Sequence, residues 1–172
     1  MRNGFVSPRV LGGLAAFLCL VLDQANKLWL IHVFDIEARR PVRLAPFFDI
    51  IYERNPGISY SLFRAQSAMG RWILVALTLF AILLLSIWLW RATNRLVALA
   101  LGCIIGGALG NAIDRIAAGA VADFYYFHIG SFSWYVFNLA DAAIVAGVAL
   151  LILDAFTSEE AGVPAPDSEG HS

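Results

Sequence analysis

Four long apolar stretches dominate the pattern of hydrophobic and polar positions along the chain. They cover about residues 10–34, 72–90, 96–116 and 136–156. A helix needs about 20 mostly apolar residues to cross a bilayer, and each stretch is long enough. The pattern therefore predicts four membrane-spanning helices, which places both chain termini on the same side of the membrane.

Two longer segments, residues 35–71 and 117–135, connect the spans on the opposite side. Residues 43–52 (RLAPFFDIIY) are aromatic and β-branched, and a turn signal, Asn55-Pro56-Gly57, separates them from residues 60–63 (YSLF). This pattern predicts a small strand-containing element outside the membrane. Segment 121–136 is also aromatic, which is typical of residues at the level of the lipid headgroups.

The two ends of the chain differ in character. Arg2 and Arg9 precede an apolar run, as in a signal peptide, but no A-x-A cleavage pattern follows, so we expect an uncleaved first span. Residues 1–157 form one predicted domain, and the small, acidic tail 158–172 is predicted to be disordered and cytoplasmic. The number of arginines on each side of the membrane does not determine the orientation of the spans. The loop 35–68 alone holds Arg39, Arg40, Arg43, Arg54 and Arg64.

Composition supports a membrane protein and excludes other classes. The 172 residues are 60% hydrophobic and 15% charged, whereas soluble domains are about half apolar and about a quarter charged. The formal net charge is −1 and Lys27 is the only lysine. The chain therefore lacks the basic patch of a nucleic-acid-binding protein, and we expect no nucleic-acid partner.

Ionisable residues inside a span are costly and mark candidate functional positions. Asp23 and Lys27 are four residues apart in the first span, so they share a helix face and can form a structural ion pair. In the third span, Gly102, Gly106 and Gly110 are also spaced by four. They form one face of small residues that allows close helix packing.

A second polar group lies at the end of the third span. Asn111, Asp114 and Arg115 are spaced by three and four residues, so they share a helix face. One explanation is an exposed ion pair between the neighbours Asp114 and Arg115. Asn111, one turn earlier, favours the alternative of a polar site.

A third polar group joins Asp123 to Asn138 and Asp141. The third and fourth spans are antiparallel neighbours, so these residues reach the same membrane face. The end of the first span and the loop that carries Asn55 open to that face too. Asp141 could alternatively serve only to stabilise a helix N-terminus, where negative charge is favoured.

Two aspartates placed close together suggest a chemistry. They cannot both ionise easily, so they share a proton. One can then act as general base on water while the protonated partner polarises a carbonyl, as in aspartic-type peptide hydrolysis. Asp114 could replace Asp123 in the pair with Asp141. We favour Asp123 because we expect Asp114 to be the ion partner of Arg115.

Other chemistries fit the residues less well. A Ser–Lys hydrolase would need Lys27 as base and Ser59 or Ser61 as nucleophile. A zinc site would lack ligands because His32 and His128 are isolated, so we expect no metal and no cofactor. A proton-coupled transporter would need a lone carboxylate near the bilayer midplane, and a structural membrane protein would use only the glycine face.

Five sequence blocks occur in a specific order. They are LDQANK (22–27), RNPGISYSLF (54–63), GGALGNAIDR (106–115), VADF (121–124) and FNLADAAI (137–144). Together, over about residues 10–156, they resemble lipoprotein signal peptidase, the signal peptidase II of bacteria. Ser59 and Tyr60 stand where many members have alanine and phenylalanine, a difference that concerns loop packing rather than catalysis.

This resemblance implies a fold and an activity. The fold is an all-α membrane protein, a four-transmembrane-helix bundle with cytoplasmic termini, an extracytoplasmic β-cradle and a short lipid-lying helix from the first loop. The activity, in the bacterial inner membrane, is removal of the signal peptide from prolipoproteins just before a diacylglyceryl-modified cysteine. Globomycin is expected to block it. The expected partners are diacylglyceryl prolipoproteins and membrane lipid, and we expect a monomer.

The resemblance also assigns roles to eight residues. The catalytic pair comprises Asp123 and Asp141. The residues that hold the substrate and orient the site are Asn111, Arg115, Asn55 and Asn138. Asp23 supports the site structurally, with Lys27 beside it, and we add Asp114 to this supporting group.

Overall fold

The computed structural model describes residues 6–57 and 68–160. Within them lie four long helices: α1 (Pro8–Leu28), which a π-helical turn η1 (Trp29–Val33) extends, α3 (Ala68–Arg91), α4 (Arg95–Ala118) and α5 (Leu139–Glu160). Each contains a stretch long and apolar enough to cross a membrane. The prediction of four spans is confirmed, and the fourth helix begins at Leu139 rather than at residue 136.

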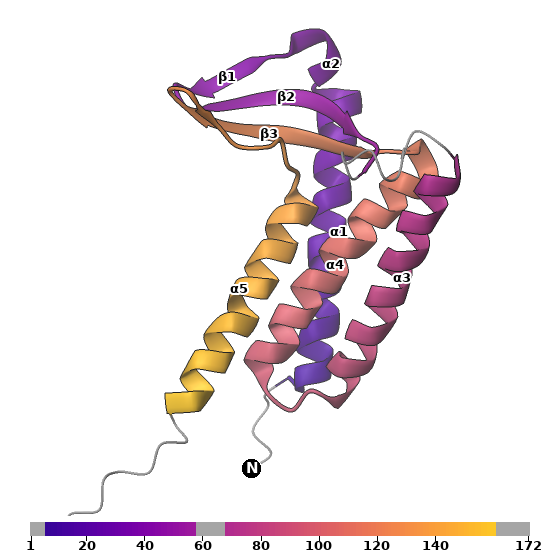
Figure 1. The fold of residues 1–172 in the computed structure, drawn as a ribbon, viewed down its shortest axis with the longest axis vertical. Helices are drawn as coiled ribbons and strands as arrows, with labels where there is room; N and C mark the ends of the chain where they lie inside the picture. Colours follow the sequence, from indigo (N-terminus) through magenta and orange to yellow (C-terminus); the bar gives the residue numbers. More distant parts are fainter. Residues whose placement is uncertain (1–5, 58–67, 161–172) are drawn as a thin grey trace, which may run out of the picture.

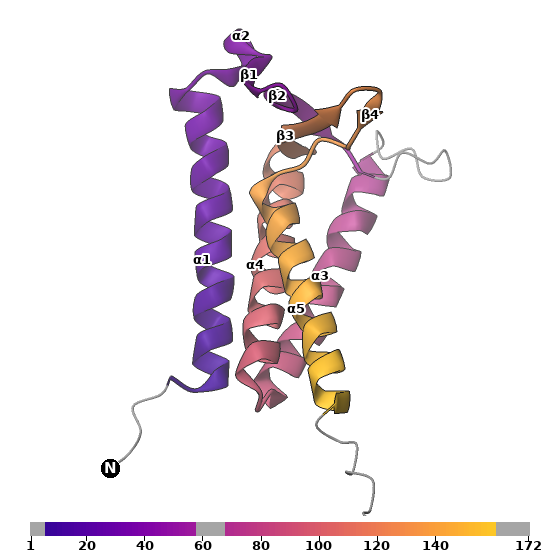
Figure 2. The ribbon, with the colours of Figure 1, turned by 90° about the vertical axis from the view of Figure 1, so that its left-hand side faces the viewer.

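The four helices form a bundle with a sheet across one end (Figures 1 and 2). Helix α1 begins, and helix α5 ends, at the opposite end of this bundle. Helix α5 continues to Glu160, beyond the predicted start of the tail at residue 158. Residues 161–172 and the predicted strand-like segment 60–63 lie outside the described residues.

The sheet is antiparallel and its strand order is β1-β2-β3-β4. After the short helix α2 (Ile36–Arg39), the first loop supplies β1 (Val42–Ala45) and β2 (Phe48–Asn55). Strands β3 (Val121–Ile129) and β4 (Phe132–Ser133) come from the second loop. The first loop supplies two strands of the predicted cradle, and the second loop adds the other two. The aromatic segment after α4 forms a strand because β2 offers it a long partner, from Phe48 to Asn55.

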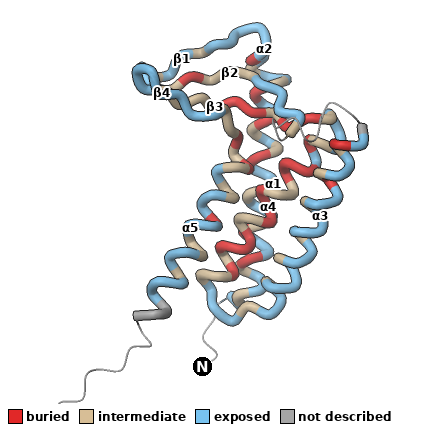
Figure 3. Tube along the Cα trace, in the orientation of Figure 1, coloured by how far each residue is buried: buried red, intermediate tan, exposed pale blue. Residues whose placement is uncertain are grey.

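Helix α4 lies at the centre of the bundle and packs against α1, α3 and α5. Buried positions accordingly gather along α4 and where the sheet meets the bundle (Figure 3). The predicted glycine face is confirmed. A side chain at Gly102 would meet the Gly12 carbonyl of α1, and one at Gly106 would meet the Ala16 carbonyl. These glycines let the two backbones approach closely.

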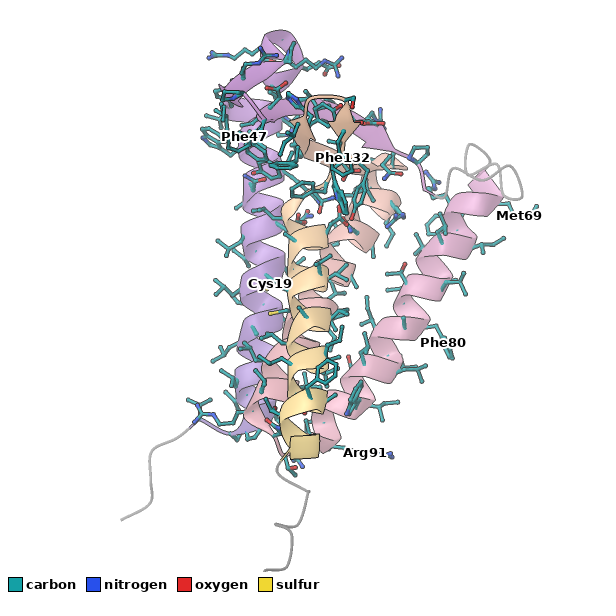
Figure 4. The ribbon with its side chains drawn as sticks, turned by 60° about the vertical axis from the view of Figure 1, so that its left-hand side comes forward. Cys19, Phe47, Met69, Phe80, Arg91 and Phe132 are labelled. Carbon is teal, nitrogen blue, oxygen red and sulfur yellow. The ribbon has the colours of Figure 1, made fainter. Side chains whose placement is uncertain are left out.

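The outer surface of the bundle is apolar. Helix α3 exposes Met69 and Phe80 along its length (Figure 4), and α5 exposes Val145. In a soluble monomer such a continuous apolar surface would be unfavourable, whereas lipid covers it in a membrane. The bundle is therefore held by small-residue packing and polar contacts inside, with its large side chains directed outward.

Close packing at Gly106 provides a test of the bundle. We expect Gly106→Ala to destabilise the folded protein by about 1–3 kcal/mol, because the added methyl group overpacks the α1–α4 contact. The measurement is the unfolding midpoint of the protein in detergent. The matched control is Gly13→Ala on α1, where an added Cβ meets nothing within 4 Å. Equal midpoints for the two variants would contradict close α1–α4 packing.

Candidate active site

Asp123 is the third residue of β3 and is buried beneath the sheet. Strand β2 runs beside it, and the side chain of Asn55, the last residue of β2, donates a hydrogen bond to Asp123 Oδ2 (3.0 Å). Asn138, from the segment before α5, donates through Nδ2 to Asp123 Oδ1 (2.6 Å). Asp123 is thus held by one amide from each extramembrane segment.

Asp141 lies in the first turn of α5. The backbone N–H of Asp141 donates to Asn138 Oδ1 (3.0 Å), and the backbone N–H of Asn138 donates to Asp141 Oδ2 (3.2 Å). This reciprocal pair caps the helix. It explains why α5 begins at Leu139. The alternative role of Asp141 at a helix N-terminus is therefore real, but it uses only one carboxylate oxygen.

The other oxygen of Asp141 faces α4. Asn111 donates through Nδ2 to Asp141 Oδ1 (2.8 Å), and its own Oδ1 accepts from Asn138 Nδ2 (3.1 Å). Asn138 therefore contacts both Asp123 and Asp141. The predicted group of Asp123, Asn138, Asp141, Asn111 and Asn55 comes together as one hydrogen-bonded cluster at the sheet end of the bundle.

The surroundings of Asp123 raise the pKa of its carboxyl. Burial raises the pKa of Asp123 to about 6, and the nearby charge of Asp141 raises it as well. The amide hydrogen bonds from Asn55 and Asn138 act in the opposite direction and limit the rise in pKa. A carboxyl with this pKa can exchange a proton near neutral pH, which suits general acid–base catalysis.

A second buried cluster lies just beneath the first. Lys27 Nζ lies 2.7 Å from Asp23 Oδ2 and 2.7 Å from Asp114 Oδ2. The predicted Asp23–Lys27 pair is confirmed. The expected ion pair between Asp114 and Arg115 is wrong: successive helical residues point roughly 100° apart, and only Asp114 faces α1. Arg115 instead donates to the Asn111 carbonyl (3.2 Å).

The second cluster holds the backbone next to each candidate catalytic residue. Asp23 Oδ1 accepts the N–H of Ala140 (3.0 Å), the residue before Asp141. Asp114 Oδ2 accepts the N–H of Ala122 (3.2 Å), the residue before Asp123. The ion-paired group therefore connects the start of α5 and the start of β3 to α1 and α4.

Sequence reasoning missed the role of Gln24. Its side-chain nitrogen lies within 3.1 Å of Asp23 Oδ2, 3.1 Å of Asp114 Oδ1 and 3.3 Å of the Gly110 carbonyl. It therefore braces both carboxylates around Lys27. Its place between Asp23 and Lys27, inside an apolar span, was a usable signal, because a buried amide there needs partners.

Two adjoining hollows open beside Asp141. One, of about 260 Å³, is lined by Asn55, Tyr135 and Asp141 among others. The other, of about 390 Å³, is largely apolar, and Trp134, Tyr135 and the exposed side of α5 line it. Arg115 Nε is buried and has no hydrogen-bond partner among the described residues. The site thus combines two carboxylates joined through Asn138, a guanidinium group close to them and an apolar surface.

The remaining candidate groups among the described residues do not join this site. Within residues 6–57 and 68–160, no three His, Cys, Asp or Glu side chains are arranged to hold a metal. His128 Nε2 lies 3.2 Å from Asp49 Oδ2 in the sheet, and His32 lies on η1. Ser59 and Ser61 lie outside the described residues.

Comparisons with known proteins agree on a family. Residues 15–157 match the family model described as signal peptidase (SPase) II. The chain is 99% identical over 167 residues to a lipoprotein signal peptidase of Beijerinckia indica, covering 97% of this chain and all of that protein. It is 64% identical over 158 residues to one of Methylocella silvestris, covering 91% and 92% of the two chains.

The fold agrees with this match. A solved structure described as a bacterial membrane enzyme superposes with a TM-score of 0.71 at 25% identity, covering 90% of this chain and 93% of that one. A second such structure gives a TM-score of 0.71 at 26% identity, covering 84% and 91%. The chain belongs to the signal peptidase II family of bacterial membrane peptidases.

Proposed function

We propose that this protein removes the signal peptide from diacylglyceryl-modified prolipoproteins, using water activated between Asp123 and Asp141. The observation that carries the mechanism is the contact of Asn138 with both carboxylates, at 2.6 Å from Asp123 and through the helix cap of Asp141. Family membership supports the substrate class, since the relatives are lipoprotein signal peptidases. The chemistry is aspartic-type peptide hydrolysis.

The proposed reaction needs one proton on the pair at the outset. The ionised carboxylate takes a proton from water, whose oxygen attacks the peptide carbonyl carbon, while the protonated carboxyl donates to the carbonyl oxygen. The tetrahedral intermediate then collapses and the carbon–nitrogen bond breaks. The leaving nitrogen takes the proton that the first carboxylate removed from water, and the second carboxylate recovers a proton from a hydroxyl of the intermediate. A raised pKa of about 6 at Asp123 suits it to hold the shared proton.

Neighbouring donors would hold the substrate. The guanidinium group of Arg115 would donate to a substrate carbonyl. Its Nε is buried and has no hydrogen-bond partner among the described residues. The side chain of Asn111 holds Asp141 in position through a hydrogen bond of 2.8 Å. The apolar hollow beside Trp134 and Tyr135 would receive the diacylglyceryl group. Globomycin would compete for the same hollow and carboxylates.

The membrane placement follows from the same proposal. The four spans and the family support a location in the bacterial inner membrane. We assign the sheet end to the extracytoplasmic side, where exported prolipoproteins arrive, and both termini to the cytoplasm. The enzyme would act as a monomer, because a single chain is enough to bring together Asp123, Asp141 and the amides that hold them.

The Ser–Lys alternative is less well supported. Lys27 Nζ contacts Asp23 and Asp114 at 2.7 Å each and Asn111 Oδ1 at 3.4 Å. These three acceptors match the three N–H donors of an ammonium group. Lys27 thus acts as a bridge between helices. The same contacts disfavour a transporter, because Asp23 is an ion-paired support and not a lone carboxylate.

Substitution of the aspartates tests the proposed mechanism. We expect Asp123→Asn and Asp141→Asn each to lower cleavage of a diacylglyceryl-modified prolipoprotein by about 10²–10⁴-fold, since each removes an acid–base group. Substrate binding and the unfolding midpoint should change little.

The matched control for these variants is Asp49→Asn, at a carboxylate buried in the sheet that contacts His128 and Arg43. We expect this variant to cleave normally. The assignment fails if Asp123→Asn retains wild-type turnover. If Asp114→Asn alone loses turnover while it remains folded, the pair is Asp114 with Asp141.

The pH profile of cleavage tests the role of Asn55. Its hydrogen bond to Asp123 lowers the pKa of that carboxyl. We therefore expect Asn55→Ala to raise the pKa of Asp123 further above about 6, which moves the limb of the kcat/KM profile that Asp123 controls to higher pH. Asn26→Ala, which loses only a hydrogen bond from Tyr125, should leave this limb in place. A shift to lower pH in Asn55→Ala would contradict the assignment.

A further inference from the structure

A separate cavity of about 260 Å³ lies on the other side of the Lys27 cluster. It is formed where the sheet-side ends of α1 and α4 meet strands β2 and β3. Its lining includes Leu28, Tyr52, Arg54 and Ile113, and none of its lining residues lines the hollows beside Asp141. The proposed peptidase mechanism does not use this cavity.

The rim of the cavity carries donors that the fold leaves available. Tyr52 and Arg54 both lie on β2, and both line the cavity. Arg54 Nη2 donates to the Ala118 carbonyl (2.7 Å), which is the one polar contact of this side chain among the described residues. The His32 ring and the Tyr52 hydroxyl have no hydrogen-bond partner among residues 6–57 and 68–160. Arg40 lies over the Tyr52 ring, 5.8 Å from its centroid.

The acidic residue in the lining does not cancel this positive character. Asp114 Oδ1 accepts from Gln24, and Oδ2 accepts from Lys27 and from the backbone N–H of Ala122. Its side chain is only 10% exposed. Lys27 is likewise occupied by its two carboxylates. The charge that an occupant would meet at the rim is therefore that of Arg54.

The opposite wall of the cavity is apolar and belongs to the membrane spans. Leu28 on α1 and Ile113 on α4 line it, and both are partly exposed on the outer surface of the bundle, at 56% and 39%. The cavity thus places cationic and hydroxyl donors directly above a lipid-facing apolar surface. An amphiphile with an anionic headgroup matches this arrangement. Its headgroup charge is opposite to that of the rim, and its acyl chains meet the apolar wall.

We propose that this cavity binds the headgroup of an anionic glycerophospholipid, with the phosphate at Arg54 and the glycerol and first acyl carbons against Leu28 and Ile113. The site also accounts for part of the arginine content of the first loop, which the peptidase reaction leaves unexplained. A lipid bound there bridges β2 to α1 and α4, as the Arg54–Ala118 hydrogen bond already does. Binding should therefore stabilise the folded protein.

The test uses the full chain purified in a neutral detergent. Dioctanoyl phosphatidylglycerol is titrated while native mass spectrometry counts bound lipid and the unfolding midpoint is recorded. We expect one lipid per chain and a rise of the midpoint with concentration. Dioctanoyl phosphatidylcholine and inorganic phosphate, at the same concentrations, should each bind about ten-fold more weakly or not at all.

Two variants locate the binding site. Arg54→Gln removes the charged donor, and Ala117→Phe fills the cavity while it leaves every charge in place, so each should raise the apparent Kd by about ten-fold. The matched control is Arg91→Gln, at an exposed arginine at the far end of α3 (Figure 4). The control should bind with the wild-type Kd. The unfolding midpoint of each variant without lipid is recorded first, and because the two variants act by different means, either one that remains folded tests the site.

Three results would overturn the proposal. Equal binding of the phosphatidylcholine analogue would exclude selection for an anionic headgroup. Equal stabilisation by inorganic phosphate would show a free-anion site instead of a lipid site. A wild-type Kd in a folded Arg54→Gln or Ala117→Phe would place the lipid elsewhere. None of these measurements involves cleavage, so their outcome is independent of the proposed peptidase function.

Discussion

The ion-paired group of Asp23, Lys27 and Asp114 is the constraint on which the rest of the structure depends. Its single ammonium group lies 2.7 Å from each carboxylate, at a depth where unpaired charge is costly. Loss of one partner of a buried pair costs about 3–5 kcal/mol, because it leaves an uncompensated charge. Helices α1 and α4 are therefore held in one relative position at the sheet end, and the glycine contacts hold them together further along the bundle.

This group also explains how two distant segments present their aspartates together. Each of its carboxylates accepts the backbone N–H that precedes a candidate catalytic residue, Ala140 before Asp141 and Ala122 before Asp123. Asn138 then connects the two aspartates, since its side chain donates to Asp123 and its backbone N–H donates to Asp141. A preorganised arrangement of this kind lets the polar groups act without reorganisation during the reaction. The ion-paired group and the two candidate catalytic residues therefore form one continuous hydrogen-bonded network.

Strand β2 contacts the helix bundle at two separate places. Asn55, at the end of β2, reaches the candidate active site, while its neighbour Arg54 bonds to the end of α4 on the other side. Alternation of side chains along a strand places these neighbours on opposite faces. One strand can thus contribute to the peptidase site on one face and to the proposed lipid site on the other.

Several features of this protein were determined by its sequence alone. The four spans follow from local hydrophobicity and length, and the Asp23–Lys27 pair follows from helical spacing within one span. The antiparallel arrangement of the last two spans was enough to bring Asp123 and Asp141 to one membrane face. These are short-range properties or simple consequences of topology, so they can be derived without knowledge of packing.

Only the tertiary structure decided which side chains meet. Asp114 pairs with Lys27, 87 positions earlier in the chain, and not with its neighbour Arg115. The aromatic segment after α4 becomes strand β3 because β2 lies beside it. Asn138 contacts both aspartates, and Gln24 braces the ion pairs from α1. Each of these contacts depends on the rotation of a helix or the register of a strand, and both are set by packing between residues far apart in the chain.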